Sequence, residues 1–231
     1  MYNFYNSSQE KTMSIIQYLF LLVAFYLFGS IPFGLIYSSM LGVDIRKVGS
    51  GNIGATNVSR QFGFFKGFVP VFIFDFLKGA LPVIIVGKLG VNFMDKDLAL
   101  IIAGFASALG HIFPIYLGFK GGKGVATFTG IYFLIAPMEC TLCLIGFLIV
   151  LLIYRLFTYL KNREGREVEN PFKVFFKKLQ EGVWASSLTA AVLFPVTIFI
   201  LEPQRRFLLA LSILTMLIVI FSHRKNIKNA Y

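Results

Sequence analysis

The chain has 231 residues, of which 57% are hydrophobic and only 14% are charged, and its net charge is +11. Soluble domains have about 45–50% apolar and about 25% charged residues. The composition therefore excludes an ordinary soluble protein and predicts an all-α polytopic membrane protein of one domain, residues 1–231. The basic residues lie between apolar runs rather than on one polar face, which excludes a nucleic-acid-binding protein.

The chain begins with a polar stretch, MYNFYNSSQEKT, which precedes a long apolar run over residues 15–41. This run exceeds the apolar part of a signal peptide, so we expect a membrane span and no cleavable leader. We expect residues 1–13 to form a flexible tail, with Met13 as an alternative start of the protein.

Seven apolar segments follow one another along the chain, and about 20 apolar residues are needed to cross the bilayer core. The fourth is too short for this, starts in a glycine-rich loop and ends at Pro137. Two interpretations stay open: a half-helix that points backbone groups at a polar site, or a tilted helix that shares a kink with the fifth segment. The segments cover residues 15–41, 67–89, 98–119, 124–136, 138–157, 184–201 and 206–222.

Lysine and arginine residues predict the orientation of these segments. Sixteen of the 22 lie in one alternate set of loops and five in the other, with Lys78 inside a segment. Since cytoplasmic loops are enriched in these residues, we predict seven transmembrane helices with the N-terminus outside and the C-terminus in the cytoplasm. The longest cytoplasmic loop, residues 158–183, is charged. It forms either an amphipathic interfacial segment or a solvated linker.

The first cytoplasmic loop contains GSGNIGATNVSR, residues 49–60. Small residues allow backbone N–H groups to turn toward an anion, and the hydroxyls of Ser50 and Thr56 add further donors. Arg60 can bind a phosphate through two hydrogen bonds. A plain turn would not need so many donors, so we interpret this motif as an anion site.

The second motif, GHIFPIYLGFKGGKGVAT, spans residues 110–127. Lys123 stands among glycines, and a helix that begins near Gly124 would add the partial positive charge of its N-terminus. The pattern is not a nucleotide-binding P-loop, because Leu117 and Gly124 occupy positions that require Gly and Ser or Thr. We therefore predict an anion site without nucleotide hydrolysis.

The third motif, SHRKNIKN, follows the last segment. His223 and Asn226 are three residues apart and share a face of a helical turn. The alternative is that this stretch contains only the basic residues usual at a cytoplasmic membrane boundary.

Polar residues within the segments need an explanation, because charges in a bilayer are costly and usually paired. Asp75 and Lys78 either pair with each other or orient cytoplasmic loop residues. Ser187, at the start of the sixth segment, can cap a helix or bind an anion. Cys140 and Cys143 lie far in sequence from both histidines, so we expect them to pack as small apolar residues.

Several enzyme classes lack their residues in this chain. Neither His111 nor His223 has an acid at the fifth following position, so the H-x-x-x-x-D pair of a large acyltransferase class is absent. Cytoplasmic acids are confined to Asp44 and the 158–183 loop, which argues against a carboxylate cluster for Mg²⁺. No G-x-S-x-G motif occurs. The motifs suit a ligand with a phosphate and an apolar part, bound without metal or cofactor.

The three motifs resemble the cytoplasmic motifs of the bacterial acyl-phosphate-dependent glycerol-3-phosphate acyltransferases, and GSIPFG and DFLKG resemble further signatures of that family. The resemblance covers about residues 27–228. It implies a seven-helix enzyme of the bacterial plasma membrane, with a cytoplasmic active site. This enzyme would move an acyl group from acyl phosphate to the sn-1 hydroxyl of glycerol 3-phosphate, releasing lysophosphatidate and phosphate. The reaction begins phospholipid biosynthesis, and a soluble enzyme would supply the acyl phosphate.

The resemblance also implies the site residues, with no metal and no cofactor. Catalysis would involve Ser50, Lys123, His223 and Asn226, and either His223 or a substrate phosphate would accept the proton. Thr56 joins the substrate-binding set as a hydroxyl of the first motif. The predicted substrate-binding residues are Ser50, Thr56, Arg60, Gly121, Gly122, Lys123, Ser187, His223 and Asn226.

The chain departs from the family in two places. The 158–183 loop is longer than expected, and Asn229 replaces a basic residue shortly before the chain ends without the usual acidic tail, which would reduce activity if that tail orders the site. The alternative function is an organophosphate anion transporter, which would require inverted repeats, but KGGKG and GSGNIGATN each occur once. Acyl-chain preference and oligomeric state stay open.

Overall fold

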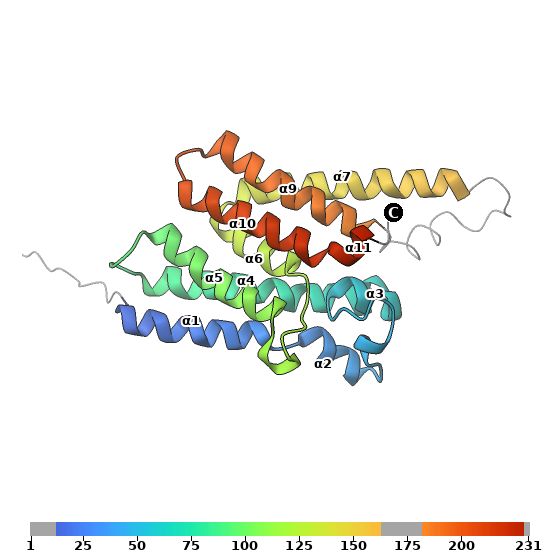
Figure 1. The fold of residues 1–231 in the computed structure, drawn as a ribbon, viewed down its shortest axis with the longest axis horizontal. Coiled ribbons are helices and arrows are strands. Elements are labelled where there is room, and N and C mark those ends of the chain that lie inside the picture. The colour runs from blue at the N-terminus through green and yellow to red at the C-terminus, as the bar shows by residue number, and fades with distance from the viewer. Residues whose placement is uncertain (1–12, 163–181, 229–231) are drawn as a thin grey trace, which may run out of the picture.

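The computed structural model describes residues 13–162 and 182–228, and all regular elements in these ranges are helices (Figure 1). This confirms the predicted all-α fold. The helices are α1 (Ile15–Ser30), α2 (Phe33–Met40), α3 (Ala55–Gly63), α4 (Val69–Leu89), α5 (Lys96–Ile112), α6 (Val125–Ile135), α7 (Pro137–Asn162), α9 (Val183–Leu201), α10 (Arg206–Ser222) and α11 (Arg224–Lys228). Short turns are η1 (Ile45–Lys47), the π-helical η2 (Phe64–Phe68) and η3 (Ile115–Leu117).

Helix α7 continues to Asn162 and so extends into the predicted 158–183 loop. Residues 163–181 of that loop and residues 1–12 of the predicted tail lie outside the described residues, whereas Met13, the last residue of the predicted tail, is buried. Within the described ranges, five helical stretches are long and apolar enough to cross a membrane. These are Ile15–Met40, Ala55–Leu89, Lys96–Leu117, Pro137–Thr158 and Val183–Leu201.

The other two predicted segments, α6 and α10, are apolar helices of 11 and 17 residues. Each predicted segment therefore contains a helix, while the number of membrane crossings and their orientation stay predictions. At 1.5 Å per residue, α6 rises roughly 16 Å, about half of the ~30 Å bilayer core. This length fits the half-helix interpretation.

Sequence features break two of the long helical stretches. Pro32 separates α1 from α2, because proline lacks the N–H that would continue the helix. Between α3 and η2 the chain turns at Gly63, whose φ of 79° disfavours any side chain. A Cβ at Gly67 would lie 2.7 Å from the Cα of Ser59, so η2 packs back on α3. Helix α3 therefore lies beside the start of α4.

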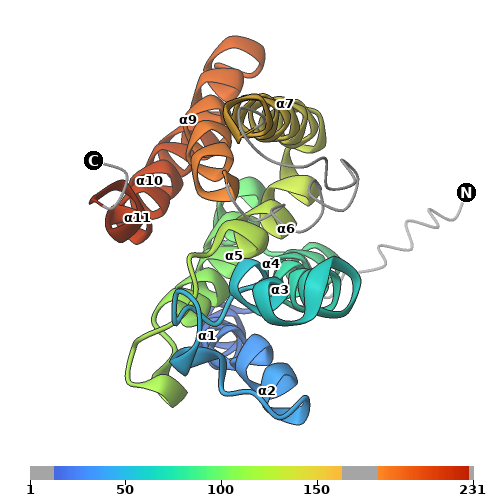
Figure 2. The ribbon, with the colours of Figure 1, turned by 90° about the vertical axis from the view of Figure 1, so that its right-hand side faces the viewer.

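Figures 1 and 2 show α1, α4 and α5 on one side of the molecule and α7, α9 and α10 on the other, with α6 between them. The largest buried cluster joins the two groups through Ile131 and Tyr132 of α6 and Phe194 of α9. The same cluster contains Cys140 and Cys143 as buried free thiols, which agrees with their expected packing role.

Helix α6 approaches the backbone of α4 through glycine. A Cβ at Gly79 would collide with the carbonyl group of Thr127, and small residues allow such close approach between membrane helices. We expect Gly79→Ala to reduce the free energy of unfolding by about 1–3 kcal/mol, measured by thermal unfolding. Gly87→Ala on the same helix is the control, because its Cβ would meet only Leu100, at 3.6 Å. Equal losses in both variants would contradict this account.

Candidate active site

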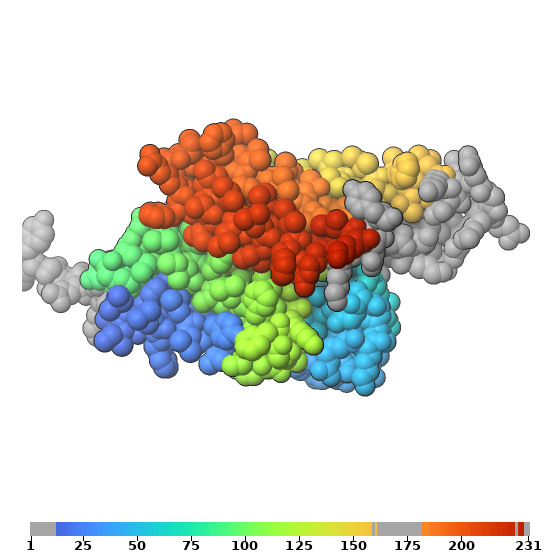
Figure 3. All heavy atoms as spheres, in the orientation of Figure 1, coloured from blue at the N-terminus to red at the C-terminus, as the bar shows by residue number. Residues whose placement is uncertain are grey.

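A cavity of about 380 Å³ lies where α3, α4, α6, α7, α9 and the α10–α11 junction meet. Figure 3 shows the last helical turns, the loop after α5 and the first-motif segment side by side at the surface near this junction. Gly121 and Gly122 do not line the cavity, but the other seven predicted site residues do. These are Ser50, Thr56, Arg60, Lys123, Ser187, His223 and Asn226.

The first motif is shaped by Asn57, which is 2% exposed. Its Oδ1 accepts a hydrogen bond from the N–H of Ser50 at 2.9 Å, and its Nδ2 donates to the carbonyls of Ile45 and Val48 at 3.0 Å each. These bonds fold the loop onto the start of α3, so that Ser50 and Arg60 reach the same cavity. Asn57 therefore organises the loop and leaves ligand contacts to its neighbours.

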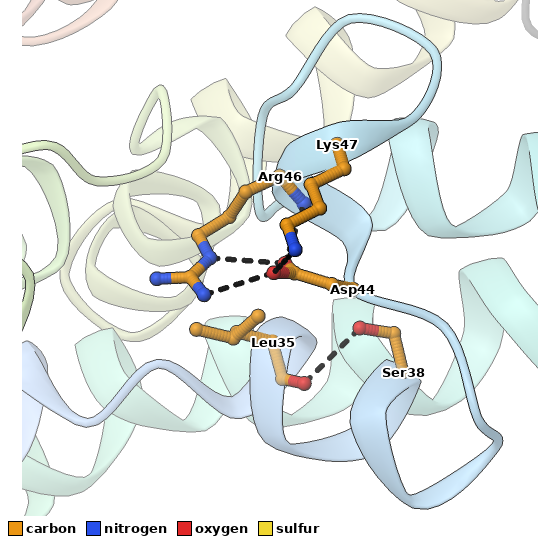
Figure 4. A network of polar contacts seen from close by, with 5 residues as sticks. All are labelled: Leu35, Ser38, Asp44, Arg46 and Lys47. Atoms are coloured by element: carbon orange, nitrogen blue, oxygen red, sulfur yellow. Dashed lines mark hydrogen bonds and ion pairs between the residues drawn. The ribbon is translucent and has the colours of Figure 1, made fainter.

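Asp44, just before this loop, is paired with Arg46 (Figure 4). The Nε and Nη2 of Arg46 donate to the two carboxylate oxygens at 2.9 Å each, and these hydrogen bonds lower the pKa of Asp44 to about 2. Asp44 does not line the cavity, and Asp75 is the one acidic residue that does so in the described part of the chain. The cavity therefore offers little negative charge against an anionic ligand.

The second motif leaves α5 and reaches the cavity at Lys123. The N–H groups of Gly121 and Gly122 donate to carbonyls at the end of α5, at 3.1 and 3.0 Å, so neither is available to a phosphate in this conformation. The expectation that these glycines hold substrate through their backbone is thus not supported by their hydrogen bonds. The amide of Asn52 donates to the carbonyl of Gly121 at 3.3 Å and joins the first motif to the second.

The third motif meets Lys123, whose Nζ donates to Oδ1 of Asn226 at 2.6 Å. Nδ1 of His223 lies 2.8 Å from the carbonyl of Val219. Since a carbonyl can only accept a hydrogen bond, Nδ1 is the donor, and Nε2 of the neutral ring is left as an acceptor. Burial, together with the charge of Lys123, lowers the pKa of His223 to about 4. Burial and nearby Arg60 lower the pKa of Lys123 to about 8. At pH 7, His223 is therefore neutral and Lys123 is charged.

Three helices begin at the cavity, and the N-cap of each is a glycine. Glycine has no side chain that could accept a hydrogen bond from the N–H groups of the first turn. Helix N-termini carry unpaired N–H groups and partial positive charge, which add to the charges of Lys123 and Arg60 to form an anion site. Ser187 lies in the second turn of α9 and donates its hydroxyl to the carbonyl of Val183 at 2.7 Å. The N-caps of α3, α6 and α9 are Gly54, Gly124 and Gly182.

Apolar side chains also line the cavity. Phe68 of η2 and Phe72 of α4 stack with their ring centroids 5.4 Å apart, and both line the cavity. Leu144 and Leu148 of α7 contribute to another wall, and Leu148 is 53% exposed. The apolar part therefore reaches the outer surface of the helix bundle, where lipid tails would lie. The spacing of the two phenylalanines by four residues is the sequence signal that could have predicted this aromatic wall.

These features define a polytopic membrane protein with an anion site next to an apolar passage. Residues 19–161 match the family model for glycerol-3-phosphate acyltransferase. The glycerol-3-phosphate acyltransferase of Desulfotalea psychrophila is 36% identical over 88% of this chain and 89% of its own length. That of Aquifex aeolicus is 48% identical over 59% and 67%. The chain therefore belongs to the glycerol-3-phosphate acyltransferase family, which confirms the resemblance found in its motifs.

Solved structures agree with this assignment. The chain resembles the crystal structure of PlsY, an integral membrane glycerol 3-phosphate acyltransferase, in its glycerol 3-phosphate form, with a TM-score of 0.74 and 35% identity over 92% of this chain and 91% of that one. The lysophosphatidic acid form of PlsY matches with a TM-score of 0.70 and 34% identity over the same shares. The membrane location and the helical architecture of the chain are consequently those of an integral membrane protein of bacteria.

Proposed function

We propose that this chain transfers a fatty acyl group from acyl phosphate to the sn-1 hydroxyl of glycerol 3-phosphate, releasing lysophosphatidate and phosphate. The observation that carries the proposal is the position of Lys123, which lines one cavity together with the first residues of three helices and several apolar side chains. Acyl phosphate has a phosphate group and an apolar acyl chain, so its binding requires an anion site next to an apolar surface. The acceptor is supported by the family and by the glycerol 3-phosphate form of PlsY.

The polar end of the cavity would hold the substrate phosphates. Lys123 and Arg60 supply the two positive charges, and a guanidinium can hold two phosphate oxygens at once. The hydroxyls of Ser50 and Thr56, which line the same wall, add donors. Asn226 keeps the Lys123 ammonium in place through its 2.6 Å hydrogen bond, so it acts on substrate partly through Lys123.

The donor chemistry asks for orientation and charge stabilisation. The sn-1 oxygen forms a bond to the acyl carbon, the bond from that carbon to the phosphate oxygen breaks, and phosphate leaves with the electron pair. Acyl phosphate is already activated, so no acyl-enzyme intermediate is required. Lys123 and the helix N-termini would stabilise the charge that develops on the leaving phosphate. A soluble enzyme would produce the acyl phosphate that enters at the cytoplasmic face.

The hydroxyl proton has two acceptors, a substrate phosphate and Nε2 of His223. Nε2 is free to accept because Nδ1 is occupied by the carbonyl of Val219, and the ring is neutral at pH 7 because burial lowers its pKa to about 4. A low pKa makes the ring a weak base. We therefore assign the proton to substrate phosphate and give His223 a positioning role at the acceptor hydroxyl.

The acyl chain would leave the cavity over Leu148. We expect Leu148→Asn to raise the KM for acyl phosphate roughly tenfold, the effect of losing contact with about two methylene groups, with the KM for glycerol 3-phosphate unchanged. Leu152→Asn, one turn further along α7, is the matched control because Leu152 is equally exposed but does not line the cavity. If both variants behave alike in initial-rate kinetics, the chain does not pass over Leu148.

The overall proposal is tested with the purified full-length protein in lipid nanodiscs. The protein is incubated with labelled glycerol 3-phosphate in three parallel reactions, which contain acyl phosphate, acyl-CoA or the acylated form of acyl carrier protein. We expect labelled lysophosphatidate with acyl phosphate alone. Product only with a thioester would refute the donor assignment. No product from folded protein, combined with uptake of labelled glycerol 3-phosphate into proteoliposomes, would favour the transporter.

A further inference from the structure

Three ionisable side chains form a buried cluster that includes His111 of the second motif, and two of them, Asp75 and His111, also line the cavity. Nζ of Lys78 and Nδ1 of His111 each lie 3.3 Å from Oδ1 of Asp75, and they are 3.2 Å from each other. Their exposed fractions are 1%, 4% and 3% for Lys78, His111 and Asp75. Ionisable residues inside a membrane segment are costly and usually functional, and the proposed chemistry leaves all three without a task.

The cluster reaches Lys123 through Gly122. The N–H of Gly122 donates to the carbonyl of His111 at 3.0 Å. A Cβ at Gly122 would lie 2.6 Å from Cε1 and 2.9 Å from Cδ2 of the His111 ring. The glycine therefore rests directly on the imidazole, and the next residue is Lys123. The position of the ring fixes the position of the loop that presents the ammonium group.

The ring in turn is held from α4. Asp75 contacts Nδ1 of His111 and Nζ of Lys78 with the same carboxylate oxygen. The Lys78 ammonium also lies over the ring of Phe33, 5.2 Å from its centroid. The ring therefore has charged partners on α4 and the loop glycine on its other side. If Asp75 and Lys78 paired only to offset the cost of their burial, they would not need the His111 ring or its contact with Gly122.

We propose that Asp75, Lys78 and His111 form a positioning unit that holds Lys123 in the place required for phosphate binding. This inference rests on the proposed role of Lys123 as a phosphate-binding residue. None of the three needs to touch the reacting atoms. A displacement of about 1 Å at a binding group can cost up to 10²-fold in rate, so loosening the ring is expected to weaken substrate binding strongly.

The test compares His111→Ala and His111→Gln with the wild-type protein in nanodiscs. We expect His111→Ala to lower kcat/KM for glycerol 3-phosphate by at least about tenfold, because a displaced Lys123 loses both phosphate binding and part of its stabilisation of the leaving phosphate. His111→Gln keeps a side chain under Gly122 and is expected to recover much of the lost kcat/KM. In a Lys123→Ala background, His111→Ala should cause no further loss, since coupled residues are non-additive.

Two further measurements separate positioning from fold stability. Ser107→Ala, one turn earlier on α5, removes a buried hydroxyl without touching Gly122 and is expected to leave both kinetic constants unchanged. If His111→Ala does not fold, the paired variant Asp75→Asn/Lys78→Met, which removes both charges together, replaces it with the same expected loss of kcat/KM. The alkaline limb of the pH profile reports the Lys123 ammonium, which Arg60 and His223 face, and it should shift toward higher pH as the loop loosens toward water.

The kinetic results distinguish failure of the positioning inference from failure of the proposed function. Wild-type kcat/KM in folded His111→Ala and in the paired variant would overturn the inference while leaving the acyltransferase proposal intact. An equal further loss from His111→Ala in the Lys123→Ala background would also overturn it, because the effect of His111 would then not pass through Lys123. Absence of lysophosphatidate with the wild-type protein would instead refute the proposed function on which the inference rests.

Discussion

Replacement of Lys123 by alanine is expected to reduce kcat/KM for acyl transfer to glycerol 3-phosphate by at least about 10³-fold. A single preorganised donor at a developing negative charge contributes about 10²–10³, and this donor is also charged. Its removal leaves Arg60 as the remaining cation that lines the described cavity and frees Asn226 from its 2.6 Å partner. Initial rates of lysophosphatidate formation, at saturating acyl phosphate, measure the loss.

Three variants make this expectation specific. Arg60→Ala should lose at least about 10²-fold, since each of the two hydrogen bonds of a bidentate charged contact contributes about 1.5–3 kcal/mol. Lys123→Arg should recover part of the activity, because the charge remains but the planar guanidinium does not fit the Asn226 contact. Lys120→Ala is the control, because Lys120 is exposed and does not line the cavity. Near-normal activity in Lys123→Ala would refute its phosphate-binding role.

The motifs could be identified from the sequence because their residue types already specify an anion site. Arg60 and Lys123 are cations among glycines and hydroxyls, and a helix start near Gly124 follows from the apolar run behind it. Their convergence with His223 on one cavity depends on contacts between distant helices, and the hydrogen bond between Lys123 and Asn226 joins residues 103 positions apart. The residue types show that Asn226 can accept a hydrogen bond from Lys123, but only the family resemblance predicted that the three motifs form one site.

Other features could not be predicted for a physical reason. A glycine beside a lysine suggests a free backbone donor, but whether Gly121 and Gly122 donate outward depends on where the carbonyls at the end of α5 lie. The contact between Lys78 and His111 links residues 33 positions apart on two helices. The sequence therefore offered two interpretations of Asp75 and Lys78, a pair or an orienting contact with loop residues, but did not predict the cluster. The turn at Gly63 separates α3 from α4, which the apolar pattern alone does not show.

The pH profile of kcat/KM for glycerol 3-phosphate is expected to have a plateau between about pH 6 and 8. Below about pH 6 the substrate phosphate takes up its second proton. Lys123 has a pKa of about 8 in the free protein, so its charge is present below that pH and is lost as pH rises through it. Affinity then falls about tenfold per pH unit. Lys123→Arg should remove this alkaline limb, because arginine stays charged.

The acid limb of kcat, measured at saturating glycerol 3-phosphate so that binding of the phosphate dianion no longer contributes, distinguishes the two proton acceptors. With a pKa of about 4, His223 is neutral throughout the plateau, and a limb caused by its protonation would lie near pH 4 rather than pH 6. A phosphonate analogue of glycerol 3-phosphate with a higher second pKa should therefore move the acid limb upward if substrate phosphate is the base. In that case His223→Gln should retain more activity than Lys123→Ala. A limb that the analogue does not move, with His223→Gln as inactive as Lys123→Ala, would instead identify Nε2 of His223 as the base.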